Sequence, residues 1–492
     1  MMTFNNLQNQ NGKSMAVSLS GGGHRATLFA LGALMYLVDA HANTSVTSIA
    51  SVSGGSLTNG LVGQTLDFRK TNGTEFRERV AKPLATQIAT KGTFFAPLFT
   101  KLYLALLIVA FILAIVIAAI APVPTDWLSS LVKDSLSPAA TEWLVMAFSG
   151  LVRIILFVVL LMLWDWLFLA RGLVCARAFN TTLFSPSGRE TKLADIKKEN
   201  LDHVICSTEF RSAEQVYFAG DFVYSFALGF GVPGDLALAR AVQSSADFPG
   251  GFPPVALPTK RHNFQDAPPP RGGGPPKPPT KMVLTDGGVY DNMGEQWARG
   301  YIDRVGRCND LAKGRIAPNQ LVVVNASARV PWSPFNSRLV PLLGEITSLL
   351  RVNNILYINT TNVRRQNIVD SFNPADPTKA SSGLPSVLVQ IAQSPFRVAR
   401  AFEAATGDLG ERARNVVKFL EAGPNSEKQW STIANENATV ATSLSKFKPE
   451  VTAQLIYQGY VVTMCNLHVL FGTDYELFAD ELAIERFRAL IA

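Results

Sequence analysis

Charged residues are scarce in this sequence of 492 residues. Asp, Glu, Lys and Arg together make up 17% of the chain, whereas apolar residues make up 48%. This balance is lower in charge than that of a typical soluble domain and is compatible with a membrane segment. The length suits one large domain with insertions, or roughly two or three ordinary domains, so the size of the buried core is not limiting.

Cysteine is also rare, and its spacing is that of no common metal site. The chain has four cysteines, none of them in a Cys-x-x-Cys pair, and they lie in apolar surroundings: Cys175, Cys206, Cys308 and Cys465. This pattern indicates reduced, structural thiols in a cytosolic compartment. The first fifteen residues are polar and lack an apolar segment, so no signal peptide is predicted.

Basic residues exceed acidic ones, but they are spread along the chain. The formal net charge is +7, and no dense cluster of Lys and Arg with interleaved aromatic residues occurs. Such a cluster is typical of nucleic-acid binding, so we expect no nucleic-acid partner. An anionic membrane surface is the favoured partner of this excess charge.

Two long apolar stretches predict a helical hairpin that crosses a membrane. Leu102 to Pro122 is uncharged and apolar over about twenty residues, enough to cross a hydrocarbon core of roughly 30 Å. Trp143 to Ala170 is the second stretch, interrupted by Arg153 and Asp165. Tryptophans stand near its ends, as expected of residues at a membrane interface: Trp143, Trp164 and Trp166.

The distribution of basic residues predicts the orientation of this hairpin. The link from Val123 to Glu142 has a single basic residue, Lys133, whereas several Lys and Arg residues lie on both flanks. By the positive-inside rule the soluble parts and both termini are cytoplasmic and the link is outside. Three explanations of Arg153 remain open: snorkelling, pairing with Asp165 of a neighbouring chain, or a segment that enters only one leaflet.

The first of three glycine-containing turns follows the predicted strand Ala16 to Ser20. Gly21, Gly22 and Gly23 are followed by His24 and Arg25 and then by apolar residues at helical spacing. Free backbone N–H groups at a helix N-terminus bind an anion, either a phosphate or the oxyanion of an acyl-transfer intermediate. An ordinary glycine-rich βα loop is the other interpretation. The spacing matches neither the P-loop nor the dinucleotide fingerprint.

The second turn places a serine between a strand and a helix. Ser53 follows the short run Thr47 to Val52, and Gly54 and Gly55 permit a sharp reversal that exposes its hydroxyl. Ser51 occupies the position of the first glycine of the usual Gly-x-Ser-x-Gly nucleophile elbow. On this motif alone a plain Gly/Ser turn is the alternative.

The third turn, Asp286-Gly287-Gly288, ends the predicted strand Lys281 to Thr285. Ligands bind outside the carboxyl ends of strands in an open α/β sheet, so the three turns can share one crevice. A serine nucleophile needs a base, and histidine is the usual one. Only His468 follows Asp286, in an apolar helical stretch, and the other histidines lie in loops, in the glycine turn or at a strand start. Asp286 is therefore the expected base by elimination.

These turns, in this order, resemble the oxyanion loop, nucleophile elbow and Asp-Gly-Gly motif of the patatin-like phospholipases. The segment Ser244 to Pro254 is similar to the Ala/Ser-rich, proline-containing stretch of that family. The resemblance extends from Ala16 to about Asn325, with the hairpin as an insertion. It implies an α/β fold of three layers around a mostly parallel central sheet, and a Ser-Asp dyad that hydrolyses lipid esters without metal or other cofactor.

In the mechanism that this resemblance implies, Asp286 accepts the proton of Ser53, which attacks the ester carbonyl of a membrane phospholipid or other acyl lipid. The N–H groups of Gly21, Gly22 and Gly23 hold the oxyanion, Arg25 orients the loop, and water releases the fatty acid. Two alternatives remain: a membrane-anchored protein with this fold that binds without turnover, and a transacylase. An intramembrane protease is disfavoured because Ser53 precedes the first apolar stretch.

The predicted organisation has five segments. A polar lead-in covers residues 1–14, the catalytic domain covers 15–95 and 172–330, the hairpin covers 96–171, and a mainly helical region that packs on the catalytic domain covers 331–492. Within that last region a helix is expected from Leu339 to Val363, and two apolar helices are expected around Val451 to Phe471 and Asp480 to Ile491. A solvated Pro/Gly-rich loop is expected from Ala267 to Thr280. An oligomer is possible, but no feature of the sequence supports one.

Overall fold

The computed structural model describes residues 12–132, 134–185, 188–265, 279–327, 361–369 and 384–491. Several predictions lie wholly or largely outside these residues. They are most of the polar lead-in, Lys133, the Pro/Gly-rich loop, and most of the helix expected from Leu339 to Val363.

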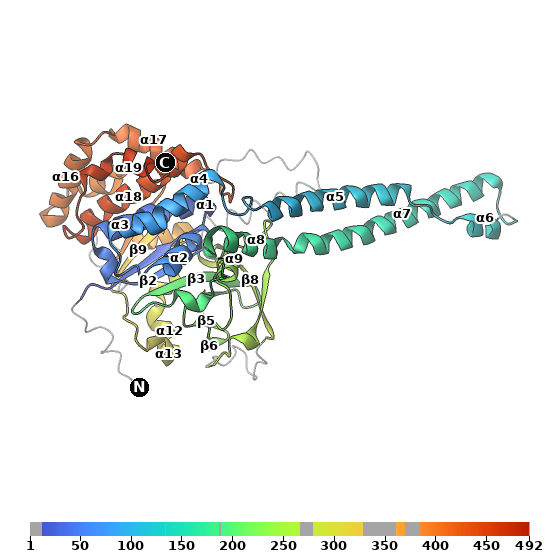
Figure 1. The fold of residues 1–492 in the computed structure, drawn as a ribbon, viewed down its shortest axis with the longest axis horizontal. Helices are drawn as coiled ribbons and strands as arrows, with labels where there is room; N and C mark the ends of the chain where they lie inside the picture. Colours follow the sequence, from blue (N-terminus) through green and yellow to red (C-terminus); the bar gives the residue numbers. More distant parts are fainter. Residues whose placement is uncertain are drawn as a thin grey trace.

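A mixed sheet forms the centre of the molecule (Figure 1). Its strand order is β10-β9-β1-β2-β3-β4-β5-β6, with β8 beside β3 and β7 beside β8. Strands β10 to β3 are parallel, and the strands beyond β3 are antiparallel. The strands are β1 (Met15–Leu19), β2 (Val46–Ser51), β3 (Asp202–Glu209), β4 (Glu214–Phe218), β5 (Val223–Ser225), β6 (Gly229–Gly231), β7 (Val255–Pro258), β8 (Lys281–Asp286), β9 (Gln320–Asn325) and β10 (Ser386–Gln390). The α/β fold class predicted from the sequence is confirmed.

Helices cover both faces of this sheet and complete three layers. Successive residues of a strand point to opposite faces, so Ile49 joins the larger core cluster while Ala50 joins a second cluster with Trp297 and Tyr301. The larger core packs α1 (Gly23–Asp39), α2 (Gly54–Thr65), α9 (Leu238–Ser245) and α18 (Pro449–Phe471). The opposite face is covered by short helices: α10 (Gly288–Asp291), α11 (Gln296–Arg299), α12 (Tyr301–Arg307) and α13 (Asn309–Ala312).

The C-terminal helices are part of the same body as the sheet. Around α18 lie α15 (Phe396–Phe402), α16 (Gly407–Glu421), α17 (Glu427–Thr439) and α19 (Glu485–Arg488). Helix α18 is buried along most of its length and crosses α1 at backbone contact. A Cβ atom added to Gly32 would lie 2.0 Å from the carbonyl oxygen of Ile456, and one added to Gly459 would lie 2.2 Å from that of Phe29. Glycine is required at both positions.

Two features of this region differ from the sequence interpretation. Strand β10 extends the sheet within a segment that we expected to be mainly helical. The helix expected from Asp480 to Ile491 is instead the short 3₁₀ turn η8 (Ala479–Leu482) followed by α19. The apolar stretch Val451 to Phe471 does form one helix, α18.

A long apolar hairpin projects from the body (Figure 1). It consists of α5 (Leu98–Ile120) and α7 (Pro138–Leu169), joined by a link that contains α6 (Asp126–Val132). By length and composition, each of the two candidate spans is sufficient to cross a membrane. The hydroxyl of Tyr103 donates to the carbonyl of Leu167 at 2.8 Å, so the chain enters and leaves the hairpin side by side.

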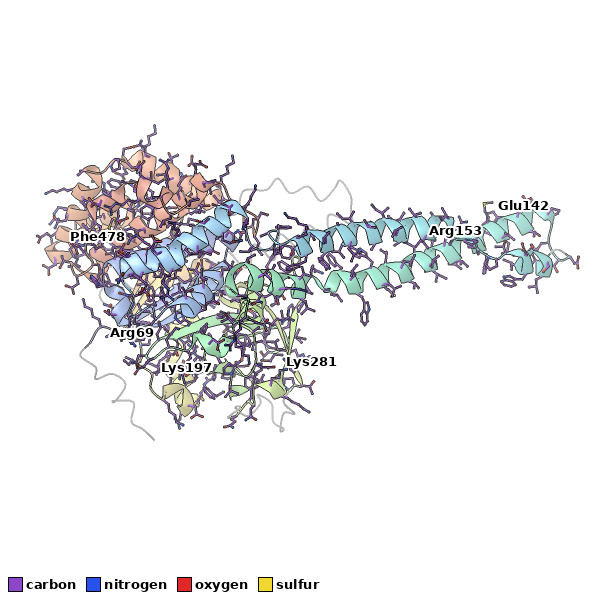
Figure 2. All side chains as sticks on the ribbon, in the orientation of Figure 1. Arg69, Glu142, Arg153, Lys197, Lys281 and Phe478 are labelled. Atoms are coloured by element: carbon purple, nitrogen blue, oxygen red, sulfur yellow. The ribbon has the colours of Figure 1, made fainter. Side chains whose placement is uncertain are left out.

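Figure 2 shows Arg153 in the outer half of this hairpin and Glu142 near its tip. The side chain of Arg153 is exposed. Neither Arg153 nor Asp165 forms an ion pair with another residue of the described chain.

Candidate active site

Ser53 lies at a strained turn between β2 and α2. Its backbone has φ 50° and ψ −117°, a conformation that is costly for a residue with a Cβ atom. The N–H of Ser53 donates to the carbonyl and the hydroxyl oxygen of Ser245, at 3.2 and 3.0 Å. A Cβ atom on Gly54 would lie 2.0 Å from the carbonyl oxygen of Gly23. The elbow is therefore held against the first glycine turn, and only glycine fits there.

Ser51 replaces the usual elbow glycine without leaving an unsatisfied hydroxyl. Its Oγ donates to the carbonyl of Val204 at 3.1 Å and accepts from Ser56 Oγ at 3.1 Å and Asn59 Nδ2 at 2.9 Å. Ser56 in turn shares a hydrogen bond of 2.9 Å with Ser245. These buried side-chain hydrogen bonds thus hold the elbow in its conformation.

Asp286 ends β8, and hydrogen bonding from the Ser53 side chain favours its ionised form, which lowers its pKa. The N–H of Gly288 donates to Asp286 Oδ1 at 2.7 Å. Burial raises the pKa of Asp286 to about 7, against the opposing effect of these two hydrogen bonds. A base with a pKa near the working pH both accepts and returns a proton efficiently.

A second buried carboxyl group, that of Asp247, lies close to Asp286. Its backbone carbonyl accepts from the N–H of Asp286 at 3.1 Å and from Thr285 Oγ1 at 3.0 Å. Burial, followed by the negative charge of Asp286, raises the pKa of Asp247 to about 8, and Arg240, Gln243 and Arg171 oppose the shift. An ionised Asp286 therefore favours the protonated form of Asp247.

The glycine turn has two backbone donors that point to no acceptor in the described chain. The N–H of Gly21 donates to the carbonyl of Asn292 at 3.0 Å, and that of His24 donates to Ser443 at 2.9 Å. The N–H groups of Gly22 and Gly23 have no such partner among the described residues. The sequence assigned all three glycine donors to an oxyanion, but in the structure the N–H of Gly21 is already engaged.

Arg25 fixes the position of this turn. Its side chain is 1% exposed, and Nε donates to the carbonyl of Ala326 at 2.9 Å. Nη1 donates to the carbonyl of Val440, in the segment between α17 and α18. The turn is thus tied to the end of β9 and to the C-terminal region.

Hydrogen bonds hold four of the five histidines away from Ser53 and Asp286. His24 is bound to Ser445 and Thr93, His203 to Asn59, His262 to Val232, and His468 to Tyr475, while His41 is exposed. Over the described ranges, no group of three or more His, Cys, Asp or Glu residues could hold a metal ion. The four cysteines are buried and form no disulfide.

Three residues of the site were not anticipated as such: Ser245, Asp247 and Asn292. The first two lie within Ser244 to Pro254, a stretch whose only signal in the sequence is its likeness to the family. Asn292 Nδ2 donates to Ser327 Oγ at 2.8 Å, and its Oδ1 would meet a Cβ atom on Gly21 at 2.3 Å. No spacing rule identifies these contacts, because they join distant parts of the chain.

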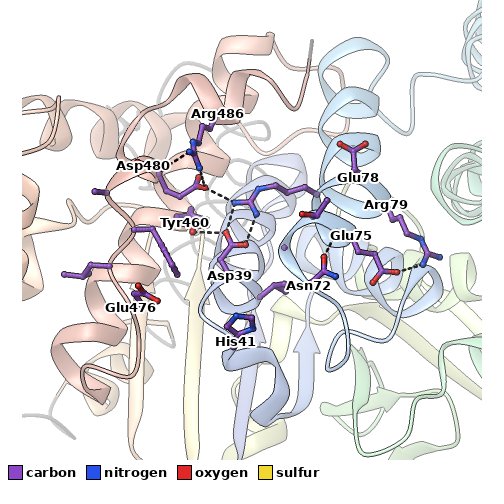
Figure 3. A pocket seen from close by; sticks show the side chains of 18 residues that line it. Asp39, His41, Asn72, Glu75, Glu78, Arg79, Tyr460, Glu476, Asp480 and Arg486 are labelled. Atoms are coloured by element: carbon purple, nitrogen blue, oxygen red, sulfur yellow. Dashed lines mark hydrogen bonds and ion pairs between the residues drawn. The ribbon is translucent and has the colours of Figure 1, made fainter.

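A separate concavity of about 1020 Å³ lies where the end of α1 meets η8 (Figure 3). Arg77 donates to both carboxylate oxygens of Asp39, at 2.7 and 2.6 Å, and to Glu481 at 3.0 Å. Arg486 also pairs with Glu481, and Tyr460 donates to Asp39 at 2.8 Å. These groups satisfy one another, so the cluster joins the C-terminal helices to the catalytic body.

A family model described as Patatin-like phospholipase matches residues 17–298. No curated protein matches the chain. Among solved structures, the crystal structure of VipD from Legionella pneumophila is similar at 13% identity, over 98% of this chain and 92% of that chain, with a TM-score of 0.27. A TM-score this low carries no argument about the site.

Proposed function

The chain belongs to the patatin-like phospholipase family, and on this premise we propose that it is a membrane-anchored serine hydrolase of lipid acyl esters. The observation that carries the proposal is that one backbone carbonyl, that of Ser245, accepts from the N–H groups of both Ser53 and Gly287 and so holds the strained elbow beside the buried Asp286. A nucleophile in contact with its base is the minimum arrangement for acyl transfer.

The proposed reaction has two steps. Ser53 Oγ attacks the ester carbonyl while Asp286 takes its proton, and the tetrahedral oxyanion accepts hydrogen bonds from the N–H groups of Gly22 and Gly23. Asp286 then returns the proton to the departing lysolipid or alcohol. In the second step, water activated by Asp286 attacks the acyl-Ser53 ester and releases the fatty acid. Each oxyanion donor contributes about 10² to 10³ in rate.

The proposed anchor is the hairpin. Helix α5 has 23 residues, which at 1.5 Å per residue is about 34 Å and exceeds a hydrocarbon core of roughly 30 Å. Arg153 lies about 24 Å along α7 from Leu169, the end nearest the body. If that end marks the near boundary of the core, the guanidinium lies within reach of the far boundary and can snorkel to it. The two flanks of the hairpin would be cytoplasmic.

Fatty-acid release from mixed phospholipid vesicles tests this proposal. Protein purified in detergent and reconstituted should release fatty acid, with or without a chelator, while Ser53→Ala and Asp286→Asn should not. A fluorophosphonate should label the parent protein but not Ser53→Ala. Absence of both release and labelling would favour a binding protein that retains the fold. Transfer of the acyl group to an added alcohol in preference to water would favour a transacylase.

A further inference from the structure

Four large apolar side chains are exposed around the foot of the hairpin. Phe95 is 41% exposed, Leu98 70%, Leu173 62% and Phe248 57%. We call these four residues the basal rim. Phe95 and Leu98 precede or begin α5, Leu173 lies in α8 (Arg171–Phe179) directly after α7, and Phe248 follows α9.

The segments that carry the basal rim pack against one another. The rings of Phe94 and Phe95 have centroids 4.8 Å apart, and those of Phe94 and Phe252 are 5.4 Å apart. Arg171 Nε donates to the carbonyl of Gly251 at 2.8 Å. The foot of the hairpin and the turn after α9 therefore form one continuous surface, beside α8 in Figure 1.

The segments that carry the basal rim contain basic but no acidic residues. Residues 91–101, 170–179 and 248–254 contain no Asp or Glu, but they contain Lys91, Lys101, Arg171 and Arg177. Lys91, Lys101 and Arg177 are exposed. Apolar side chains bordered by cations match the boundary between the acyl chains and headgroups of an anionic bilayer.

The same surface is connected to the candidate active site through the segment from Ser245 to Phe248. The carbonyl of Ser245 accepts from the N–H groups of Ser53 and Gly287, both at 3.2 Å. The carbonyl of Asp247 accepts from the N–H of Asp286 at 3.1 Å, and Phe248 is the next residue. The backbone that holds both residues of the proposed dyad thus continues directly into the basal rim.

We propose that the basal rim is the surface by which the catalytic body rests on an anionic lipid bilayer, with Phe248 inserted between headgroups. This inference rests on the proposed function. The rim places the elbow beside the membrane surface, so that the ester group of a lipid reaches Ser53 while its acyl chains stay in contact with apolar side chains. The rim therefore serves bilayer substrates and is not needed for small soluble esters.

Site-specific labelling tests the location of the rim directly. The native cysteines are buried, so Phe248→Cys, Leu173→Cys and the control Ile302→Cys, on α12, each provide one accessible thiol for an environment-sensitive fluorophore. Ile302 is 44% exposed. In Figure 1, α12 lies away from the foot of the hairpin. In nanodiscs of phosphatidylcholine and phosphatidylglycerol, labels at 248 and 173 should shift to shorter wavelength and be quenched by nitroxide lipids. Labels at 248 and 173 that resemble the label at 302 would overturn the proposal.

Rates on a bilayer substrate and on a soluble ester distinguish an effect of the basal rim on membrane contact from an effect on the catalytic step. Phe248→Ser and Leu173→Ser should lower hydrolysis of nanodisc phospholipid about tenfold, the size expected from losing burial of one large apolar side chain. The rate on a water-soluble short-chain ester should stay at the parent level, as should both rates for Ile302→Ser. Equal loss on both substrates would show a merely structural role. If the parent hydrolyses neither ester, the proposed function fails, and the labelling still decides whether the rim meets the bilayer.

Discussion

At Asp286, burial and hydrogen bonding shift the pKa of one carboxyl group in opposite directions, and burial has the larger effect. Burial raises its pKa to about 7, and the protonated form cannot accept the proton of Ser53. We therefore predict that kcat/KM for a soluble ester is lost as the pH falls through about 7 and reaches a plateau above it. The pH dependence of kcat/KM measures this decrease on the acid side.

The neighbouring carboxyl group provides the matched control for that profile. Burial and the negative charge of Asp286 both raise the pKa of Asp247, so the protonated form of Asp247 is favoured once Asp286 is ionised. Asp247→Asn should therefore leave the midpoint near 7. A midpoint near 4 in the parent protein would contradict the assignment of Asp286 as a buried base.

At the residue scale, the sequence predicts those site residues that belong to a recognisable short turn. Ser53 and Asp286 stand in glycine turns after strands, a pattern visible within a few residues. The engagement of the Gly21 N–H is not visible in this way, because its acceptor is the carbonyl of Asn292, brought there by the sheet. The family likeness predicts a mostly parallel sheet, but the strands beyond β3 are antiparallel: β4, β5 and β6 follow β3 in consecutive order, and β8 pairs with β3 from later in the chain.

Among the elements, α1 and α18 approach each other to backbone contact. We predict that Gly32→Ala and Gly459→Ala each lower the free energy of unfolding by about 1–3 kcal/mol or more, because a methyl group would overlap a backbone carbonyl of the other helix. Ester hydrolysis should fall as well, since α1 carries the oxyanion turn. Denaturant unfolding in detergent measures the stability.

Gly150→Ala in α7 is the control for these substitutions. A Cβ atom at Gly150 would meet nothing within 4 Å, so the substitution should be neutral or stabilising by up to about 1 kcal/mol. Equal effects at all three glycines would show that helix propensity, and not the close contact, determines the result.

The ion-pair cluster of Arg77 joins elements that are far apart in the sequence. We predict that Arg77→Ala lowers the free energy of unfolding by about 2–4 kcal/mol, because it leaves the largely buried carboxylates of Asp39 and Glu481 without this partner. The matched control is Arg79→Ala, whose pair with Glu75 is mostly exposed and should contribute much less to the free energy of unfolding. Similar losses in the two variants would contradict the clustering argument.

Strand β10 shows why an element can escape prediction. Its five residues, Ser386–Gln390, form a short apolar run, and periodicity alone does not separate such a run from part of a buried helix. The segment forms a strand because it pairs with β9, whose residues lie far earlier in the chain. The helices of the hairpin and α18 were predicted because long apolar stretches indicate a helix without reference to a pairing partner.

On the scale of the whole molecule, the hairpin is an insertion, and its first and last turns lie side by side at the catalytic body. We predict that replacing residues 98–169 by a short Gly/Ser linker leaves the rate on a soluble short-chain ester within about twofold, because the sheet and the elbow lie outside this segment. The shortened protein should leave the membrane fraction. Sedimentation of membranes and the ester assay measure the two properties. Loss of the soluble activity would show that the hairpin also supports the catalytic body.

The contacts of the oxyanion turn have a consequence for the order in which the protein is made. His24 and Arg25 are held by Val440, Ser443 and Ser445, which leave the ribosome long after the hairpin does. Folding during synthesis proceeds from the N-terminus, so the turn lacks these partners while the apolar helices are already available for insertion. We therefore expect a nascent chain to reach its membrane before it becomes a competent hydrolase, which would protect other lipids from it in transit.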